Sequence, residues 1–260
     1  FLVFVPLFNG AECVRASDAM TERACDLVAA HPYDPSRPAE IPPTEFANIN
    51  VDIALPLCKT AVLKNPQNAR LNFQLGRVYD RAHEALKAKG AFEKAIELGH
   101  SEAITSLGVL HHEGNIGPAH SKAAQQLFET AASRGSIIGM VMLRDIYLEA
   151  AASGRDMTKI DRLSKALVEA YERAVAAESQ RAMVDYGLFL EAGKAVQSDV
   201  QKARALYEKA AALGSLDGMT NLSRVLQAGG DQEAARAWRE KAVRAGVCHL
   251  RSESVVAEKV

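Results

Sequence analysis

The sequence predicts an all-α fold, and three observations support that prediction. Alanine, the best helix former, accounts for 45 of the 260 residues. Aromatic residues, which favour strands, make up only 6% of the chain. Similar motifs also recur at intervals close to the length of a helical hairpin. We therefore expect a right-handed superhelical solenoid of about five antiparallel helix hairpins, preceded by a two-helix head.

Charge and motif content exclude several classes of function. The 31 Lys+Arg and 32 Asp+Glu give a net charge of −1, whereas a nucleic-acid binder normally carries a basic excess. No stretch approaches the roughly 18 consecutive apolar residues of a membrane-spanning helix. The common hydrolase, nucleotide-binding and metalloprotease motifs are also absent. We expect a protein that is not an enzyme and has no cofactor, metal or small-molecule substrate.

Residues 1–12 form a separate apolar segment. Phe1–Phe8 reads FLVFVPLF and is followed by small and polar residues, as at the end of a secretory signal. Three interpretations stay open. The block is the remnant of a signal, or it packs on its own domain, or it docks on a partner or a membrane surface.

Residues 13–68 are expected to form the head, with helices over Asp18–Ala30 and Val51–Lys64 on either side of a Pro-rich stretch. Cys25 and Cys58 each fall on the apolar side of their helix. This placement predicts a disulfide between them, and hence an oxidising, extracytoplasmic location; two buried free thiols are the alternative. A bond between Cys13 and Cys248 would require the ends of the chain to meet.

Residues 69–247 carry five repeats, and residues 248–260 a terminal cap or tail. The repeat anchors are spaced by 32, 36, 43 and 36 residues, and they are Leu75-Gly76, Leu107-Gly108, Leu143-Arg144, Tyr186-Gly187 and Leu222-Ser223. A second motif such as Ala91-Phe92-Glu93-Lys94-Ala95 follows each anchor. Four units are expected to close on a glycine, at Gly99, Gly135, Gly214 and Gly246, while Glu178 stands at that place in the third.

These motifs resemble the Sel-one-like repeat, a relative of the tetratricopeptide repeat, and Ala103–Gly135 and Gly193–Gly214 match it most closely. The resemblance implies a protein–protein adaptor or scaffold. A Cys-bearing head before such repeats looks like a capping module of exported proteobacterial proteins. Together they imply a periplasmic or secreted accessory subunit of a larger envelope or membrane-associated assembly, with protein partners that include a membrane protein complex.

The resemblance also implies a partner groove, because the first helix of each tetratricopeptide hairpin lines the concave surface. The residues that would line it here are Arg70, Gln74, Arg77, Arg81, His112, Glu113, Asp145, Glu149, Asp185, Glu191, Arg224 and Gln227. The alternative is that these are ordinary exposed helix positions.

A different function is binding or hydrolysis of a cell-wall ligand, a peptidoglycan or a β-lactam. Sel-one-like proteins linked to that function carry a disulfide in each repeat. Here no Cys lies between Lys59 and Val247, which favours the adaptor interpretation.

Overall fold

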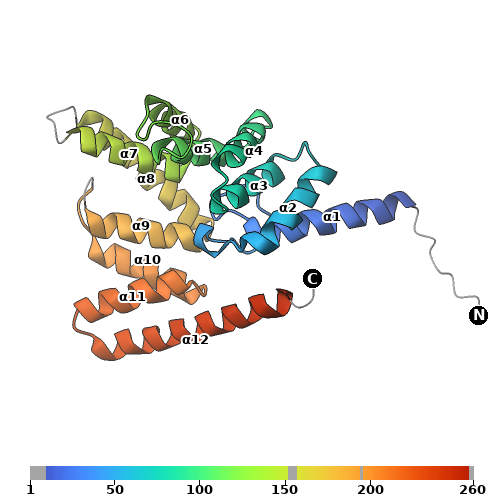
Figure 1. The fold of residues 1–260 in the computed structure, drawn as a ribbon. Coiled ribbons are helices and arrows are strands. Elements are labelled where there is room, and N and C mark those ends of the chain that lie inside the picture. Colours follow the sequence, from blue (N-terminus) through green and yellow to red (C-terminus); the bar gives the residue numbers. More distant parts are fainter. Residues whose placement is uncertain (1–9, 152–156, 194–195, 258–260) are drawn as a thin grey trace, which may run out of the picture. The chain divides into compact units, whose positions relative to one another are not determined.

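The computed structural model describes residues 10–151, 157–193 and 196–257, which form twelve α-helices and one short 3₁₀-helix (Figure 1). The predicted all-α fold of antiparallel helix pairs is confirmed. The chain divides into two compact units, with the boundary between Leu143 and Arg144. The expectations for Phe1–Phe8 and for a bond between Cys13 and Cys248 lie outside the residues and side chains that the structure describes.

The head contains α1 (Gly10–Ala29), a short 3₁₀-helix (Phe46–Asn48) and α2 (Val51–Lys64). Cys25 of α1 and Cys58 of α2 form the predicted disulfide, with a Cα–Cα distance of 4.7 Å and both side chains fully buried. Residues of α1, α2 and α3 bury their apolar side chains in one cluster around this disulfide. The head therefore shares its hydrophobic core with the first repeat.

In the first unit, helical pairs follow the head. Their helices are α3 (Ala69–Arg81), α4 (Ala85–Glu97), α5 (Glu102–His112), α6 (Lys122–Ser133) and the beginning of α7 (Ile137–Ala151). The second unit contains the end of α7 and five further helices, which are α8 (Thr158–Ala176), α9 (Gln180–Ala192), α10 (Val200–Ala212), α11 (Leu216–Ala228) and α12 (Gln232–Ala257).

The anchor glycines allow an aromatic ring of the second helix to lie directly against the first helix. A Cβ atom added at Gly76 would lie 2.5 Å from ring carbons of Phe92, and one added at Gly108 would lie 2.7 Å from Phe128. Gly187 faces the ring of Tyr207 in the same way. Real Cβ atoms do not approach a ring this closely. The aromatic residue of the second motif can therefore pack on the first helix only because the anchor residue is glycine.

Several helices begin after a serine cap and end at a residue with a positive φ angle. Ser121, Ser179 and Ser215 each accept a hydrogen bond from a backbone N–H in the first turn of the following helix. Gly99, Gly135 and Gly214 have positive φ angles, as a helix-ending residue requires. Glu178 takes the same left-handed conformation in the third repeat, at φ 57°. The expectation for Gly246 is wrong, because α12 continues through it to Ala257.

Candidate functional site

The four residues predicted to line the groove of the first repeat form a single row on α3. Arg70, Gln74, Arg77 and Arg81 follow one another at intervals of 4, 3 and 4 residues, so their side chains project from the same face of the helix. We refer to these four residues as the α3 column. Each of them forms a hydrogen bond with the head of the same chain.

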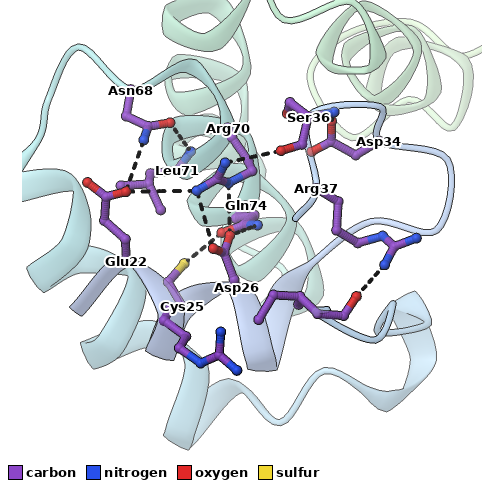
Figure 2. A network of polar contacts seen from close by, with 12 residues as sticks. Glu22, Cys25, Asp26, Asp34, Ser36, Arg37, Asn68, Arg70, Leu71 and Gln74 are labelled. Carbon is purple, nitrogen blue, oxygen red and sulfur yellow. Dashed lines mark hydrogen bonds and ion pairs between the residues drawn. The ribbon is translucent and has the colours of Figure 1, made fainter. Parts of the chain in front are cut away.

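Asp26 of α1 is the main acidic partner of the α3 column (Figure 2). Nε and Nη2 of Arg70 donate hydrogen bonds to its two carboxylate oxygens, at 2.9 and 3.2 Å. Nε2 of Gln74 donates a third to Oδ1, at 2.8 Å. Asp26 is 2% exposed, so its carboxylate is removed from water. The positive charge of Arg70 and the three hydrogen bonds from Arg70 and Gln74 compensate for the lost hydration. Glu22 adds a longer ion pair to Arg70, at 3.8 Å.

The arginines of the column also bind the main chain of the head. Their guanidinium groups donate to four carbonyl oxygens, those of Ala29, Ser36, Thr44 and Ala47. Arg77 is the most deeply placed, at 3% exposure, and Nη2 lies 2.9 Å from the carbonyl oxygen of Thr44. Burial lowers the pKa of Arg77 to about 10, although the charges of Glu45, Asp34 and Asp80 oppose that change.

The prediction of an open groove in the first repeat therefore needs correction. In this structure the loop between α1 and α2 contacts the α3 column along its length, and Gln74 and Arg77 are almost fully buried. The segment that contacts these residues belongs to the same chain. This loop of about 20 residues is much longer than an ordinary connection between paired helices, and its length allows it to follow α3.

A second buried contact joins the head loop to the turn between α4 and α5. His100 Nε2 lies 3.2 Å from Asp34 Oδ2, and neither side chain is more than 4% exposed. The imidazole also stacks on Phe73 with a ring-centroid distance of 4.2 Å. Burial alone would raise the pKa of Asp34. The hydrogen bond and charge of His100, together with hydrogen bonds from Ser36, outweigh that effect and hold it below its usual value of 3.8.

Glu102, at the start of α5, is a buried acid close to this pair. Burial raises the pKa of Glu102 from 4.5 to about 7, the hydrogen bond from Ser136 at 3.0 Å opposes the increase, and the charge of Asp34 adds to it. The carboxyl of Glu102 is therefore half protonated near neutral pH, which makes the stability of this junction sensitive to pH.

His112 and Glu113, the candidates of the second repeat, lie at the end of α5. The ring of His112 packs edge-on against that of His120, with centroids 4.2 Å apart. Glu113 is exposed and accepts a hydrogen bond from Asn115 at 2.8 Å. Burial, followed by the negative charge of Glu113, raises the pKa of Asp80 to about 6.

The acidic candidates of the second unit differ in their surroundings. Asp145 forms an ion pair with the neighbouring Arg144 at 2.7 Å, and Glu149 is exposed on the same helix. Asp185 is half-buried and forms an ion pair with Arg181, one turn earlier on α9, at 2.8 Å. Two of these three acidic residues are paired with an arginine of their own helix.

Two other candidates are brought together across the repeats. Glu191 of α9 accepts hydrogen bonds from Nη1 of Arg224 of α11, at 3.2 Å, and from the hydroxyl of Tyr207 of α10, at 2.6 Å. Burial raises the pKa of Glu191, but these hydrogen bonds outweigh it and hold the pKa below 4.5. Gln227, one turn after Arg224, accepts a hydrogen bond from Arg239 at 2.7 Å.

Sequence reasoning did not single out Leu188, an exposed leucine on the same helix as Asp185 and Glu191. It lies on α9 between Asp185 and Glu191 and is 43% exposed. It stands one residue after the anchor Gly187, which is the place that Arg77 occupies after Gly76. Aligning the anchors would have identified it, since the corresponding position after Ser223 is Arg224.

Within residues 10–151, 157–193 and 196–257, no group of three His, Cys, Asp or Glu side chains is placed to hold a metal ion. A membrane-spanning helix is likewise not found among the residues that the structure describes.

Comparison with known proteins identifies the repeats. The family model described as Sel1 repeat matches residues 101–136 and 180–215, which are the Sel-one-like units centred on Gly108 and Gly187. This chain is a Sel1 repeat protein. Its fold is of the tetratricopeptide-like helical-repeat type, and no curated protein matches its sequence.

Solved structures extend the comparison over most of the chain. An immunity protein from Pseudomonas aeruginosa is 17% identical, with 88% of this chain and 82% of that one covered, at a TM-score of 0.52. A Sel1 repeat protein from Oxalobacter formigenes is 22% identical over 76% of this chain and 81% of that one, with a TM-score of 0.49. A protective antigen of uropathogenic Escherichia coli is 21% identical. The match covers 76% of this chain and 43% of that one, with a TM-score of 0.45.

At these identities the likeness concerns the fold alone. Folds of this type are typically non-catalytic scaffolds that bind proteins, and this Sel1 repeat protein is consistent with that class. The disulfide in the head is a feature of oxidising, extracytoplasmic compartments.

Proposed function

We propose that this Sel1 repeat protein is a non-enzymatic adaptor, exported to the periplasm or secreted, that binds protein partners as an accessory subunit of a larger envelope or membrane-associated assembly. The single observation that carries the proposal is the surface formed by Asp185, Leu188 and Glu191 of α9 with Arg224 of α11. We call these four residues the second-unit surface.

The second-unit surface has the composition of a protein-binding site. An exposed leucine stands among charged groups whose geometry is fixed by hydrogen bonds, so a partner can bury the leucine without first ordering the polar side chains around it. The pair of Glu191 and Arg224 joins α9 to α11, which belong to successive repeats. A partner would then bind two repeats at once, which is the usual way in which a repeat array builds its interface.

The disulfide supports the proposed compartment. Cys25 and Cys58 are bonded and fully buried. Structural disulfides persist mainly in oxidising compartments. The disulfide therefore supports export. In this proposal the chain associates with a membrane through its protein partner.

The test is recovery of partners from a solubilised membrane fraction with the tagged full chain. Leu188→Asp should reduce recovery of a defined partner by about tenfold, because a buried leucine at an interface contributes roughly 1–2 kcal/mol. Leu213→Asp is the matched control, since Leu213 is also 43% exposed but lies at the end of α10. Equal recovery with both variants would reject this surface. A chain that stays alone and binds muropeptides would reject the adaptor function.

A further inference from the structure

Four buried polar residues meet where the head loop contacts the second repeat. They are Asp34 of the loop, His100 in the turn before α5, Glu102 in the first turn of α5 and Ser136 in the turn before α7, and we call them the junction cluster. Each of them is at most 6% exposed. Their contacts therefore join three segments that are far apart in the sequence.

The two carboxylate oxygens of Asp34 have different partners. Oδ1 accepts hydrogen bonds from the backbone N–H and the hydroxyl of Ser36, at 2.8 and 2.6 Å, within the same turn of the loop (Figure 2). Oδ2 faces Nε2 of His100 at 3.2 Å, while Nδ1 of His100 has no hydrogen-bond partner among the described residues. The contact between Asp34 and His100 is thus a polar link from this turn of the loop to the repeats.

Other charged or titratable side chains lie close to the junction cluster. Arg77 of α3 experiences the charge of Asp34, but its guanidinium donates to carbonyl oxygens of the head. Arg37 donates to a carbonyl oxygen of the loop itself. His31, also in the loop, packs edge-on against the phenylalanine ring on which His100 stacks. The two arginines therefore already bind main-chain oxygens of the head.

Glu102 is bound by a neutral donor. The hydroxyl of Ser136 donates to Oε2 at 3.0 Å, and Oγ1 of Thr105 lies 2.9 Å from the same hydroxyl. Burial raises the pKa of Glu102 to about 7, the hydrogen bond from Ser136 opposes the increase, and the charge of Asp34 adds to it. Near neutral pH this carboxyl therefore changes its charge inside the folded protein.

Ionisation of Glu102 places a second negative charge in this buried site. His100 and Asp34 compensate each other when the imidazole is protonated. A second carboxylate in the same site is repelled by Asp34 and is kept away from water. Asp34 lies on a loop, whereas Glu102 lies on a helix that packs on its neighbours, so movement of the loop separates the two carboxylates most easily.

We infer that the junction cluster is a pH-sensitive switch that controls the contact between the head loop and the repeats, and that Glu102 is the residue that responds to pH. At acidic pH Glu102 is neutral and Asp34 stays against His100. As the pH rises, ionised Glu102 repels Asp34, and residues 31–44 open locally while the helices stay folded. The inference goes beyond the proposed function, because it concerns the first unit and does not involve the second-unit surface.

The test is hydrogen–deuterium exchange of the oxidised full chain between pH 5 and 8, with each rate corrected for the intrinsic pH dependence of amide exchange. Residues 31–44 contain hydrogen-bonded amides, such as those of Asp34, Arg37 and Thr44. Because the pKa of Glu102 is raised from 4.5 to about 7 in the closed state, ionisation favours the open state. Protection of residues 31–44 should therefore fall at least about tenfold from pH 5 to 7 and change little above that.

Two variants separate this switch from a general effect of pH. Glu102→Gln keeps a neutral side chain of similar shape, so protection of residues 31–44 should change by less than about twofold over the same range. Glu97→Gln is the matched control, since Glu97 is an exposed glutamate at the end of α4, and it should retain the fall seen in wild type.

Circular dichroism at 222 nm checks that Glu102→Gln remains helical. If it does not, Ser136→Ala takes its place. This variant removes the hydrogen bond that opposes the raised pKa of Glu102, so the fall in protection should level off at a higher pH than in wild type.

Equal protection of residues 31–44 at pH 5 and 8 in the wild-type chain, or an undiminished fall in Glu102→Gln, would overturn the inference. An equal fall over residues 69–97 would also overturn it, because it would show general destabilisation rather than local opening. In Ser136→Ala, a fall that levels off at or below the wild-type pH has the same meaning. Recovery of partners through Leu188 depends on the second unit, so this inference and the proposed function fail separately.

Discussion

One added methyl group at Gly108 tests the packing on which the repeat depends. In Gly108→Ala the new Cβ would lie 2.7 and 2.9 Å from two ring carbons of Phe128 and 3.3 Å from Cβ of Leu127. Carbon atoms in contact normally lie about 3.5–4.0 Å apart, so the ring must move by about 1 Å. Phe128 is fully buried, so its ring can move only by displacing its neighbours in the core.

The expected magnitude is the difference between two opposing effects. Overpacking a well-packed core costs about 1–3 kcal/mol, and a shift this large belongs at the upper end of that range. Replacing Gly by Ala inside a helix contributes about 1 kcal/mol of stability. The free energy of unfolding of Gly108→Ala should therefore fall by about 2 kcal/mol.

Gly90→Ala provides the matched control. Gly90 lies within α4, and a Cβ atom added there meets no atom within 4 Å. This variant should gain about 1 kcal/mol, so the two substitutions should differ by about 3 kcal/mol in urea unfolding. Shortening the ring side chain with Phe128→Leu in the Gly108→Ala background should recover part of the loss. If Gly108→Ala is as stable as Gly90→Ala, the explanation of the anchor glycines is wrong.

Three further predictions concern other features of the fold. Removing the disulfide with Cys25→Ala and Cys58→Ala should lower the free energy of unfolding by about 3–4 kcal/mol, and an unchanged urea midpoint would contradict the stabilising role assigned to the bond. Because burial raises the pKa of Glu102 from 4.5 to about 7, the folded state binds the extra proton, so the contribution of Glu102 to stability should decrease as pH rises from about 4.5 to 7 and level off above that. Relative to wild type, Glu102→Gln should therefore gain up to about 3 kcal/mol over this range, and a pH-independent difference would refute the assignment. Glu178→Gly should raise the free energy of unfolding by about 1 kcal/mol, since φ 57° is unfavourable for a residue with a Cβ atom, whereas Glu178→Ala should give no such gain.

The repeats could be predicted from the sequence because three of the five carry the same pair of residue types. A glycine at the anchor and an aromatic residue about 20 positions later are both visible in the sequence, and they meet in space at Gly108 and Phe128. The disulfide was predictable for a similar reason, since Cys25 and Cys58 each lie on the apolar side of a helix.

The occupation of the α3 column could not be predicted, because most of its contacts are to main-chain carbonyls. Every residue has such a carbonyl, so Ser36, Thr44 and Ala47 carry no distinguishing pattern. The end of the last helix was missed for a different reason. Gly99 and Gly214 adopt positive φ angles at helix ends, whereas Gly246 lies inside α12, because glycine permits a left-handed turn without requiring one.

The central claim is that the head is held against the first repeat by the disulfide and the α3 column. Hydrogen–deuterium exchange on the oxidised and reduced full chain tests it most directly. In the oxidised chain the loop amides that donate hydrogen bonds, such as those of Ile41 and Thr44, should exchange slowly. After reduction, exchange over residues 26–47 should become faster while residues 101–136 remain unchanged. Identical exchange of the loop in the two states, or equal acceleration over both regions, would contradict the account.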